Sequence, residues 1–303
     1  MESALITFPI ISDRLVFDTP GYLSIFGFKV YLYGLFITAG FALAAIYLSR
    51  RHKMLGLATD NVLDLVILAV PCGLIGARLY YAIFNASYYF GPGNWLNIFR
   101  FREGGLAVYG GVIGGVLAFI IYGKIKKIPI PRLFDAGAFG LFIGQAVGRW
   151  GNFFNREAFG SETTVPWKMG LTTAAGTIYV HPTFLYESLW NIIGFILLHN
   201  FSKKRKVRFD GQCFLFYAIW YGFGRFIIES YRTDSLFIAA TGIRASQLLA
   251  ALSFTVAVVL MIRNYINKTR TVDGEDSPLS DESGDSLICD PTELNELSEA
   301  ITD

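Results

Sequence analysis

Charged residues are scarce in this chain of 303 residues, because Asp, Glu, Lys and Arg make up only 17% of it. Soluble globular domains carry about a quarter of their residues as charge, so the composition excludes an ordinary soluble protein. Intrinsic disorder is excluded for most of the length, since 53% of the residues are hydrophobic. Cysteine and histidine are rare and show no disulfide or metal-ligand spacing: Cys72, Cys213, Cys289, His52, His181 and His199. We therefore expect neither a metal nor a cofactor.

Long apolar runs recur along the chain, and each has close to the ~20 residues that an α-helix needs to cross a bilayer. Seven runs are predicted as spans: Val30–Ser49, Asn61–Phe84, Leu106–Tyr122, Leu133–Arg149, Pro182–Phe201, Gln212–Tyr231 and Thr241–Ile262. The mean hydropathy of +0.45 agrees with this assignment. The predicted fold class is an all-α polytopic membrane protein with seven transmembrane helices.

The lysines and arginines between the spans set the orientation. They gather after the first, third, fifth and seventh spans: Arg50, Arg51, Lys53, Lys124, Lys126, Lys127, Arg132, Lys203, Lys204, Arg205, Lys206, Arg208, Arg263, Lys268 and Arg270. With seven spans all of these lie on one side, which the positive-inside rule makes the cytoplasm. Residues 1–29 are then an external N-terminal segment, and residues 30–270 form the transmembrane domain.

The chain after the last span has the opposite charge. Residues 271–303 hold eleven Asp or Glu and no Lys or Arg, whereas basic residues outnumber acidic ones in the remainder. This segment lacks apolar periodicity and is rich in Ser, Gly and Asp, which is typical of a solvated, disordered extension. We expect a disordered acidic tail on the cytoplasmic side.

Charged residues inside the predicted spans need a reason, because an arginine at a helix centre costs ~2.5–3.5 kcal/mol on insertion. At ~1.5 Å per residue, Arg78, Arg149 and Arg225 lie ~25, ~24 and ~20 Å from the cytoplasmic starts of their spans. All three are expected in the outer half of the bilayer, where they suit an anionic head group such as a phospholipid phosphate. Separate snorkelling arginines are the alternative, with even weight for Arg78 alone.

The sixth span places Arg225, Glu229 and Arg232 at i, i+4 and i+7, on one face of a helix. Glu229 can then orient one arginine and leave positive charge for a ligand. A structural ion-pair ladder is the competing interpretation, because buried ionic groups often only satisfy each other.

The segment Gly148–Gly160 starts where the fourth span reaches the outer surface. It holds Arg149, Asn152 and Glu157 within ten residues. Non-helical backbone at such a depth is tolerated only inside protein or along a cavity, which favours a binding site.

Two other glycine patterns favour helix packing. Gly140, Gly144 and Gly148 form a stripe on the fourth span, and Gly104–Gly115 opens the third span. Tyr109 falls near the outer interface, where its position alone indicates an aromatic-belt residue.

Gly148–Gly160 closely resembles the signature of the prolipoprotein diacylglyceryl transferases, bacterial membrane enzymes that lipidate lipoproteins. Other motifs agree with the family in order: Tyr33-Gly34-Leu35, Gly76-Ala77-Arg78, Gly104–Gly115, His181-Pro182-Thr183, Tyr186-Glu187 and Arg225-Phe226-Ile227-Ile228-Glu229. The resemblance covers roughly Val30 to Ile262, and the family also has seven spans and an external N-terminus.

The resemblance implies transfer of the diacylglyceryl group of phosphatidylglycerol to the lipobox cysteine thiol of a prolipoprotein, which forms a thioether and releases glycerol phosphate. It also implies the bacterial cytoplasmic (inner) membrane, an active site facing the outer leaflet, and no nucleic-acid partner. Together with the charge pattern, it gives Arg149, Arg225, Glu157, Tyr109 and Tyr33 as catalytic candidates, and Asn152, Arg78, Glu229, Arg232 and Gly160 as substrate-binding candidates.

The group that takes the thiol proton stays open at this stage. Many family members have histidine where this chain has Tyr109. A phenol with a pKa near ~10 is a poor resting base at neutral pH. Glu157, a phosphate oxygen or a tyrosine activated by nearby arginines are the remaining alternatives.

Two other functions are alternatives to the transferase hypothesis. A transporter of an anionic lipid or solute would also line a cavity with arginines, but its site belongs near the midplane of the membrane. Another phospholipid head-group enzyme, such as a phosphatase or synthase, would need a histidine nucleophile or an aspartate cluster, and neither is evident.

Overall fold

The computed structural model describes residues 5–91, 94–101, 104–203, 209–238 and 242–275. The chain divides into two units, residues 1–265 and residues 266–303. The second unit is described only as far as Glu275, the end of its helical part. The basic residues at 204–206 and 208, and the predicted acidic tail from residue 276 onward, lie outside the described residues.

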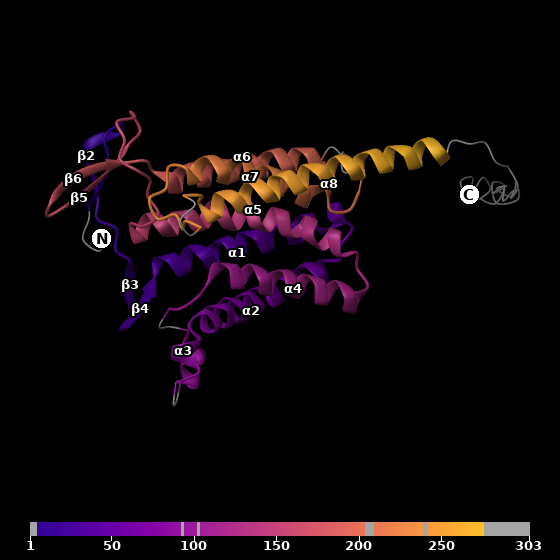
Figure 1. Ribbon diagram of the computed structural model, residues 1–303, viewed down its shortest axis with the longest axis horizontal. Helices are drawn as coiled ribbons and strands as arrows, with labels where there is room; N and C mark the ends of the chain where they lie inside the picture. The colour runs from indigo at the N-terminus through magenta and orange to yellow at the C-terminus, as the bar shows by residue number, and fades with distance from the viewer. Residues whose placement is uncertain (1–4, 92–93, 102–103, 204–208, 239–241, 276–303) are drawn as a thin grey trace, which may run out of the picture. The chain divides into compact units, whose positions relative to one another are not determined.

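In the described part of the chain, seven helices have 18 residues or more (Figure 1): α1 Leu32–Arg51, α2 Thr59–Phe84, α4 Val108–Lys126, α5 Ile130–Asn155, α6 Thr183–Lys203, α7 Gln212–Glu229 and α8 Ala245–Glu275. Each overlaps one of the seven predicted spans. The described connections between them contain three short helical elements: η1 His52–Leu55, α3 Ala86–Tyr89 and η2 Trp95–Phe99. The chain is therefore mostly helical, as the apolar runs predict.

Four described helical stretches are long and apolar enough to cross a membrane: Leu32–Leu55, Thr59–Phe84, Val108–Lys126 and Ala245–Asn267. Helices α5, α6 and α7 are also long but fall outside this set of four. Each carries a charged residue in its interior or last turns: Arg149, Glu187 and Arg225 respectively. Membrane crossing by all seven helices stays a prediction.

Two small antiparallel sheets correct the prediction of an all-α chain. Strands β1 Leu5–Phe8, β2 Ser12–Phe17, β5 Met169–Thr173 and β6 Gly176–Val180 form one sheet in the order β2-β1-β5-β6, and β3 Tyr22–Ile25 pairs with β4 Phe28–Tyr31. Figure 1 shows the strands at one end of the helices, where α5 leads into α6. The sheet ties the N-terminal segment to the α5–α6 connection.

The last helix, α8, ends later than the predicted start of the acidic segment. We expected the acidic segment to begin at Thr271, but α8 continues through that residue to Glu275. No glycine or proline interrupts the chain from Ile262 to Val272, so nothing in the sequence ends the helix there.

Helices pack tightly where glycines meet. A Cβ on Gly114 of α4 would lie 3.3 Å from the Cα of Gly73 and would overlap the carbonyl of Cys72 on α2. The two backbones therefore approach as small residues in membrane helices allow. The core between α1, α5, α6 and α7 is instead filled by large side chains such as Phe139, Phe142 and Leu198.

Substitution of Gly114 by leucine is expected to weaken the α2–α4 contact, because overpacking typically costs ~1–3 kcal/mol. Its neighbour Gly115 is the matched control, since a Cβ there would meet nothing within 4 Å. Thermal unfolding of the purified protein should show a lower Tm for Gly114→Leu and little change for Gly115→Leu. Equal Tm values for the two variants would contradict the packing assigned here.

Candidate active site

Glu187, near the start of α6, is the centre of a charged cluster. Its side chain is only 3% exposed. Its Oε2 lies 2.5 Å from Nη2 of Arg149, and its Oε1 lies 3.0 Å from Nη1 of both Arg225 and Arg232. One buried carboxylate therefore contacts three guanidinium groups.

The helix arrangement explains this convergence. Arg149 lies near the end of α5, Glu187 near the start of α6, and Arg225 near the end of α7. A hydrogen bond of 2.8 Å from the hydroxyl of Ser188 to the carbonyl of Ala146 joins α6 to α5 beside the cluster. Because consecutive helices alternate in direction, these three ends meet at the same end of the bundle.

Three further charged residues contact the arginines around Glu187 or one another. Glu229, only 1% exposed, lies 2.6 Å from Nη2 of Arg225, and Asp234 lies 2.7 Å from Nη2 of Arg232. Arg244 donates a hydrogen bond to the carbonyl of Glu229. We call these residues together the arginine–carboxylate cluster: Arg149, Glu187, Arg225, Glu229, Arg232, Asp234 and Arg244. Its four arginines face three carboxylates, so the cluster keeps an excess of positive charge.

The ion pair with Arg232 determines the protonation state of Asp234. Burial raises the pKa of Asp234, but the hydrogen bonds and charge of Arg232 outweigh burial and hold this pKa below its ordinary value. The carboxyl is therefore ionised at neutral pH and fixes Arg232.

Asn152 links the cluster to Glu157. Its Oδ1 accepts a hydrogen bond of 3.3 Å from Nη1 of Arg149, and its Nδ2 donates one of 3.0 Å to Oε1 of Glu157. The left-handed backbone of Arg156, with φ of 55°, ends α5 and turns the chain back so that the exposed Glu157 reaches Asn152. The structure thus joins Arg149, Asn152 and Glu157 in one hydrogen-bonded chain.

Gly160 holds Arg232 in place through its backbone. It forms an isolated bridge with Arg232 and donates a hydrogen bond of 2.9 Å to the carbonyl of His181. A Cβ at this position would lie 2.7 Å from the Cβ of His181 and 2.9 Å from the carbonyl oxygen of Tyr231. A side chain here would therefore displace the segment that carries Arg232.

Tyr33 lies beside the same region. A Cβ on Gly151 of α5 would lie 2.7 Å from Cδ2 of Tyr33, so the ring of Tyr33 packs directly against the backbone of α5. Gly151 is two residues from Arg149, and Tyr33 is near the start of α1. The structure therefore places Tyr33 against the α5 segment that carries Arg149, without a hydrogen bond or ion pair to the cluster among the described residues.

Arg78 occupies a different environment. It is 2% exposed and donates hydrogen bonds of 2.5–3.0 Å to five backbone carbonyl oxygens, those of Asn97, Ile98, Arg100, Gly104 and Gly105. Its guanidinium thus holds the loop between η2 and α4. This contact set supports a structural role, the alternative that the sequence left at even weight for Arg78.

Tyr109 lies at the start of α4 and is 43% exposed. Among the described residues, it forms no hydrogen bond or ion pair with the arginine–carboxylate cluster. The structure therefore does not join it to the other candidates.

Glu187, Asp234 and Arg244 are absent from the sequence-based site. A signal was available for Glu187, because it is a carboxylate inside a predicted span and the same insertion cost applies to it as to the arginines. Arg244 falls inside the predicted span Thr241–Ile262, so the same signal applied to it. Asp234 lies in the connection between α7 and α8, where charge is ordinary, and no comparable sequence signal marks it.

The fold and this site define a mostly helical protein of membrane type with a buried arginine–carboxylate cluster at one end. Residues 20–263 match the sequence model of the prolipoprotein diacylglyceryl transferase family. The chain belongs to this family and is a transferase.

Named relatives agree over most of their length. A phosphatidylglycerol–prolipoprotein diacylglyceryl transferase of Clostridioides difficile is 40% identical over 256 residues, which are 84% of this chain and 96% of the relative. Proteins of the same name from Enterococcus faecalis and Oceanobacillus iheyensis are 43% and 42% identical. The matches cover 78% and 80% of this chain, and 87% and 85% of those relatives.

Proposed function

We propose that this enzyme takes the diacylglyceryl group from phosphatidylglycerol and transfers it to the cysteine thiol of a prolipoprotein lipobox, the first step of lipoprotein maturation. The observation that carries the proposal is the convergence of Arg149, Arg225 and Arg232 on buried Glu187. Arginine offers a planar fork of donors that matches phosphate, and a cluster with excess positive charge favours an anionic head group.

The reaction is a displacement at a glycerol carbon. The thiolate sulfur forms a bond to that carbon, and the bond from the carbon to the phosphate oxygen breaks, so glycerol phosphate leaves with the electron pair. Arg149 and Arg225 bind the phosphate and stabilise the negative charge that grows on the departing oxygen. Their fixed positions also align the carbon with the thiolate.

The neighbours of Arg149 have supporting roles in this proposal. Asn152 fixes the guanidinium of Arg149 and presents Glu157 beside it. Tyr33 packs on α5 at Gly151, and Gly160, which has no side chain, lets the segment with Arg232 approach. Glu157 or a phosphate oxygen receives the proton from the thiol. Glu157 is exposed and accepts a hydrogen bond from Asn152, which also bonds Arg149.

The proposed membrane arrangement has seven spans, an external N-terminus and a cytoplasmic C-terminus in the bacterial cytoplasmic membrane. Basic residues occupy the last turns of α1, α4 and α6. The cluster lies at the opposite ends of α5, α6 and α7, which supports a site facing the outer leaflet under the positive-inside rule. A transporter is not favoured, because its binding site belongs near the membrane midplane.

Tyr109→Phe tests the proton acceptor. If Tyr109 only donates a hydrogen bond, loss of its hydroxyl should lower kcat/KM by about 10-fold or less, in line with a net ~1 kcal/mol for one hydrogen bond. Steady-state kinetics with lipid and peptide measure this. A loss above about 1000-fold with lipid binding intact would instead assign acid–base chemistry to the phenol.

The proposed reaction is tested with purified protein, phosphatidylglycerol and a synthetic lipobox peptide. Mass spectrometry should show the peptide with one added diacylglyceryl group, and glycerol phosphate should form in equal amount. A peptide in which serine replaces the lipobox cysteine is the control and should stay unmodified. A product that retains the phosphate, or modification of the serine peptide, would contradict the proposed displacement.

A further inference from the structure

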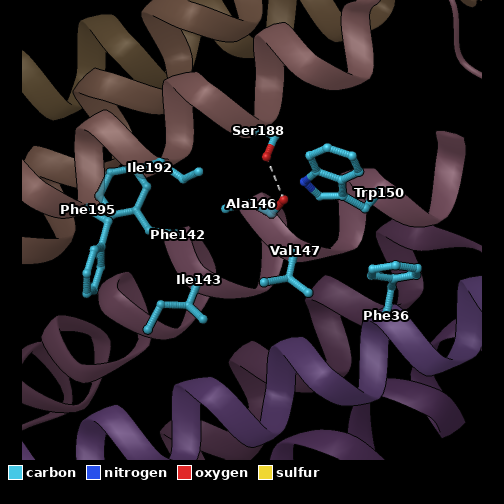
Figure 2. Close-up of a pocket in the computed structure, with 9 residues that line it drawn as sticks. All are labelled: Phe36, Phe142, Ile143, Ala146, Val147, Trp150, Ser188, Ile192 and Phe195. Carbon is cyan, nitrogen blue, oxygen red and sulfur yellow. Dashed lines mark hydrogen bonds between the residues drawn. The ribbon is translucent and has the colours of Figure 1, made fainter. Parts of the chain in front are cut away.

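An apolar groove of about 410 Å³ lies between α1, α5 and α6 (Figure 2). Nine residues line it: Phe36, Phe142, Ile143, Ala146, Val147, Trp150, Ser188, Ile192 and Phe195. The hydroxyl of Ser188 already donates to the carbonyl of Ala146 at 2.8 Å. The lining is therefore almost entirely hydrocarbon, and it suits the apolar part of a ligand.

The groove begins beside the arginine–carboxylate cluster. Ser188 directly follows Glu187, Trp150 directly follows Arg149, and Val147 lies two residues before Arg149. Figure 2 shows Trp150 toward one end of the groove and Phe142 and Phe195 toward the other. The step from Trp150 to Phe142 spans eight residues of α5, or ~12 Å along the helix. A ligand that extends from the cluster into the groove must join an anionic group to a hydrocarbon chain.

We propose that this groove holds one acyl chain of the diacylglyceryl donor and sets the chain length that the enzyme prefers. The inference rests on the proposed binding of the donor phosphate by Arg149 and Arg225. From the cluster near the ends of α5 and α7, the groove leads back along α5 toward its middle. That is the direction an acyl chain takes from an outer-leaflet head group.

The main competing occupant is an apolar side chain of the prolipoprotein signal segment. A peptide would bring backbone amides with it, and these need hydrogen-bond partners in an apolar environment. Apart from Ser188, which is already bonded, the indole of Trp150 is the polar side chain among the nine lining residues. The lining therefore favours an acyl chain, which carries no such groups.

Ile192→Trp and Ile193→Trp form a matched pair of variants. Both isoleucines lie on α6 and are 40% and 48% exposed, so both sites have room for a larger side chain, but only Ile192 lines the groove. For Ile192→Trp, kcat/KM with dipalmitoyl phosphatidylglycerol should fall roughly 10-fold more than with the dioctanoyl lipid. Ile193→Trp should leave the ratio between the two lipids unchanged. Ile192→Ala, which enlarges the groove, should shift the ratio toward the longer lipid.

Two results would overturn the acyl-chain assignment. One is an equal loss on both lipids for Ile192→Trp, and the other is a loss that follows the hydrophobicity of the peptide instead of the lipid. Displacement of a fluorescent phosphatidylglycerol by the two lipids gives a readout without turnover. If wild-type protein binds both lipids but modifies no peptide, the proposed reaction is contradicted. The acyl-chain assignment is tested separately by lipid binding, and it is still supported if only Ile192→Trp changes the relative affinity for the two lipids.

Discussion

Alanine at Arg225 or at Arg149 is expected to lower diacylglyceryl transfer by more than about 100-fold, because each arginine stabilises charge that develops on the leaving phosphate. Arg225 contacts both Glu187 and Glu229, and Arg149 contacts Glu187 and Asn152. Lysine at either position should restore only part of the activity, since an ammonium group cannot make the bidentate hydrogen bonds that a guanidinium makes to phosphate.

Arg132→Ala is the control for this experiment. Arg132 also makes a bidentate interaction with a carboxylate, donating hydrogen bonds of 3.0 and 3.2 Å to Asp210. That pair is about a third exposed and belongs to the opposite end of the helices, so its loss should change stability by ~0–1 kcal/mol and leave transfer intact. Full activity of Arg149→Ala or Arg225→Ala would refute the role assigned to the arginines.

Glu187→Ala is expected to have the second large effect, on both stability and activity. The substitution leaves three partly buried guanidinium groups without their shared carboxylate. Removal of one partner from a buried ion pair typically costs ~3–5 kcal/mol. Transfer should also fail, because Arg149 and Arg225 lose the group that fixes their positions. Chemical unfolding of the purified protein and the peptide assay measure the two effects separately.

Asp234→Asn tests whether the large effect expected at Glu187 comes from burial of the carboxylate and not only from its ion pair with an arginine. Asp234 contacts the same Arg232, but its side chain is 49% exposed, whereas that of Glu187 is 3% exposed. Solvent screens such a pair, so its loss should change the free energy of unfolding by ~0–1 kcal/mol. If Glu187→Ala were no more destabilising than Asp234→Asn, Glu187 would not be the structural centre of the cluster.

The order and approximate positions of the helices follow from the apolar runs, although α8 continues to Glu275, beyond the predicted end of its span at Ile262. The predicted span Asn61–Phe84 and helix α2, Thr59–Phe84, differ only at the start. The strands escaped prediction for a physical reason, since those of the larger sheet have only 4–6 residues. Strand β1 also pairs with β5, which is far away in the sequence, and a local pattern cannot show such a partner.

Depth along a helix indicates which of the arginines can meet, but not which of them do. Arg149, Arg225 and Arg232 do meet, as their shared depth and helical face indicate. Arg78 has a similar predicted depth, but it bonds to loop carbonyls, because depth does not say which way a side chain points. The pairing of all three arginines with one glutamate required the packing of α6 against both α5 and α7.

The central claim is that the arginine–carboxylate cluster recognises the phosphate of the donor lipid. Native mass spectrometry of the purified protein in detergent tests it directly, by comparing bound phosphatidylglycerol with bound diacylglycerol of the same acyl chains. Wild-type protein and Arg132→Ala should retain phosphatidylglycerol at least about 10-fold more strongly, whereas Arg225→Ala should lose this preference. Equal retention of the two lipids by wild-type protein, or an unchanged preference in Arg225→Ala, would contradict the claim.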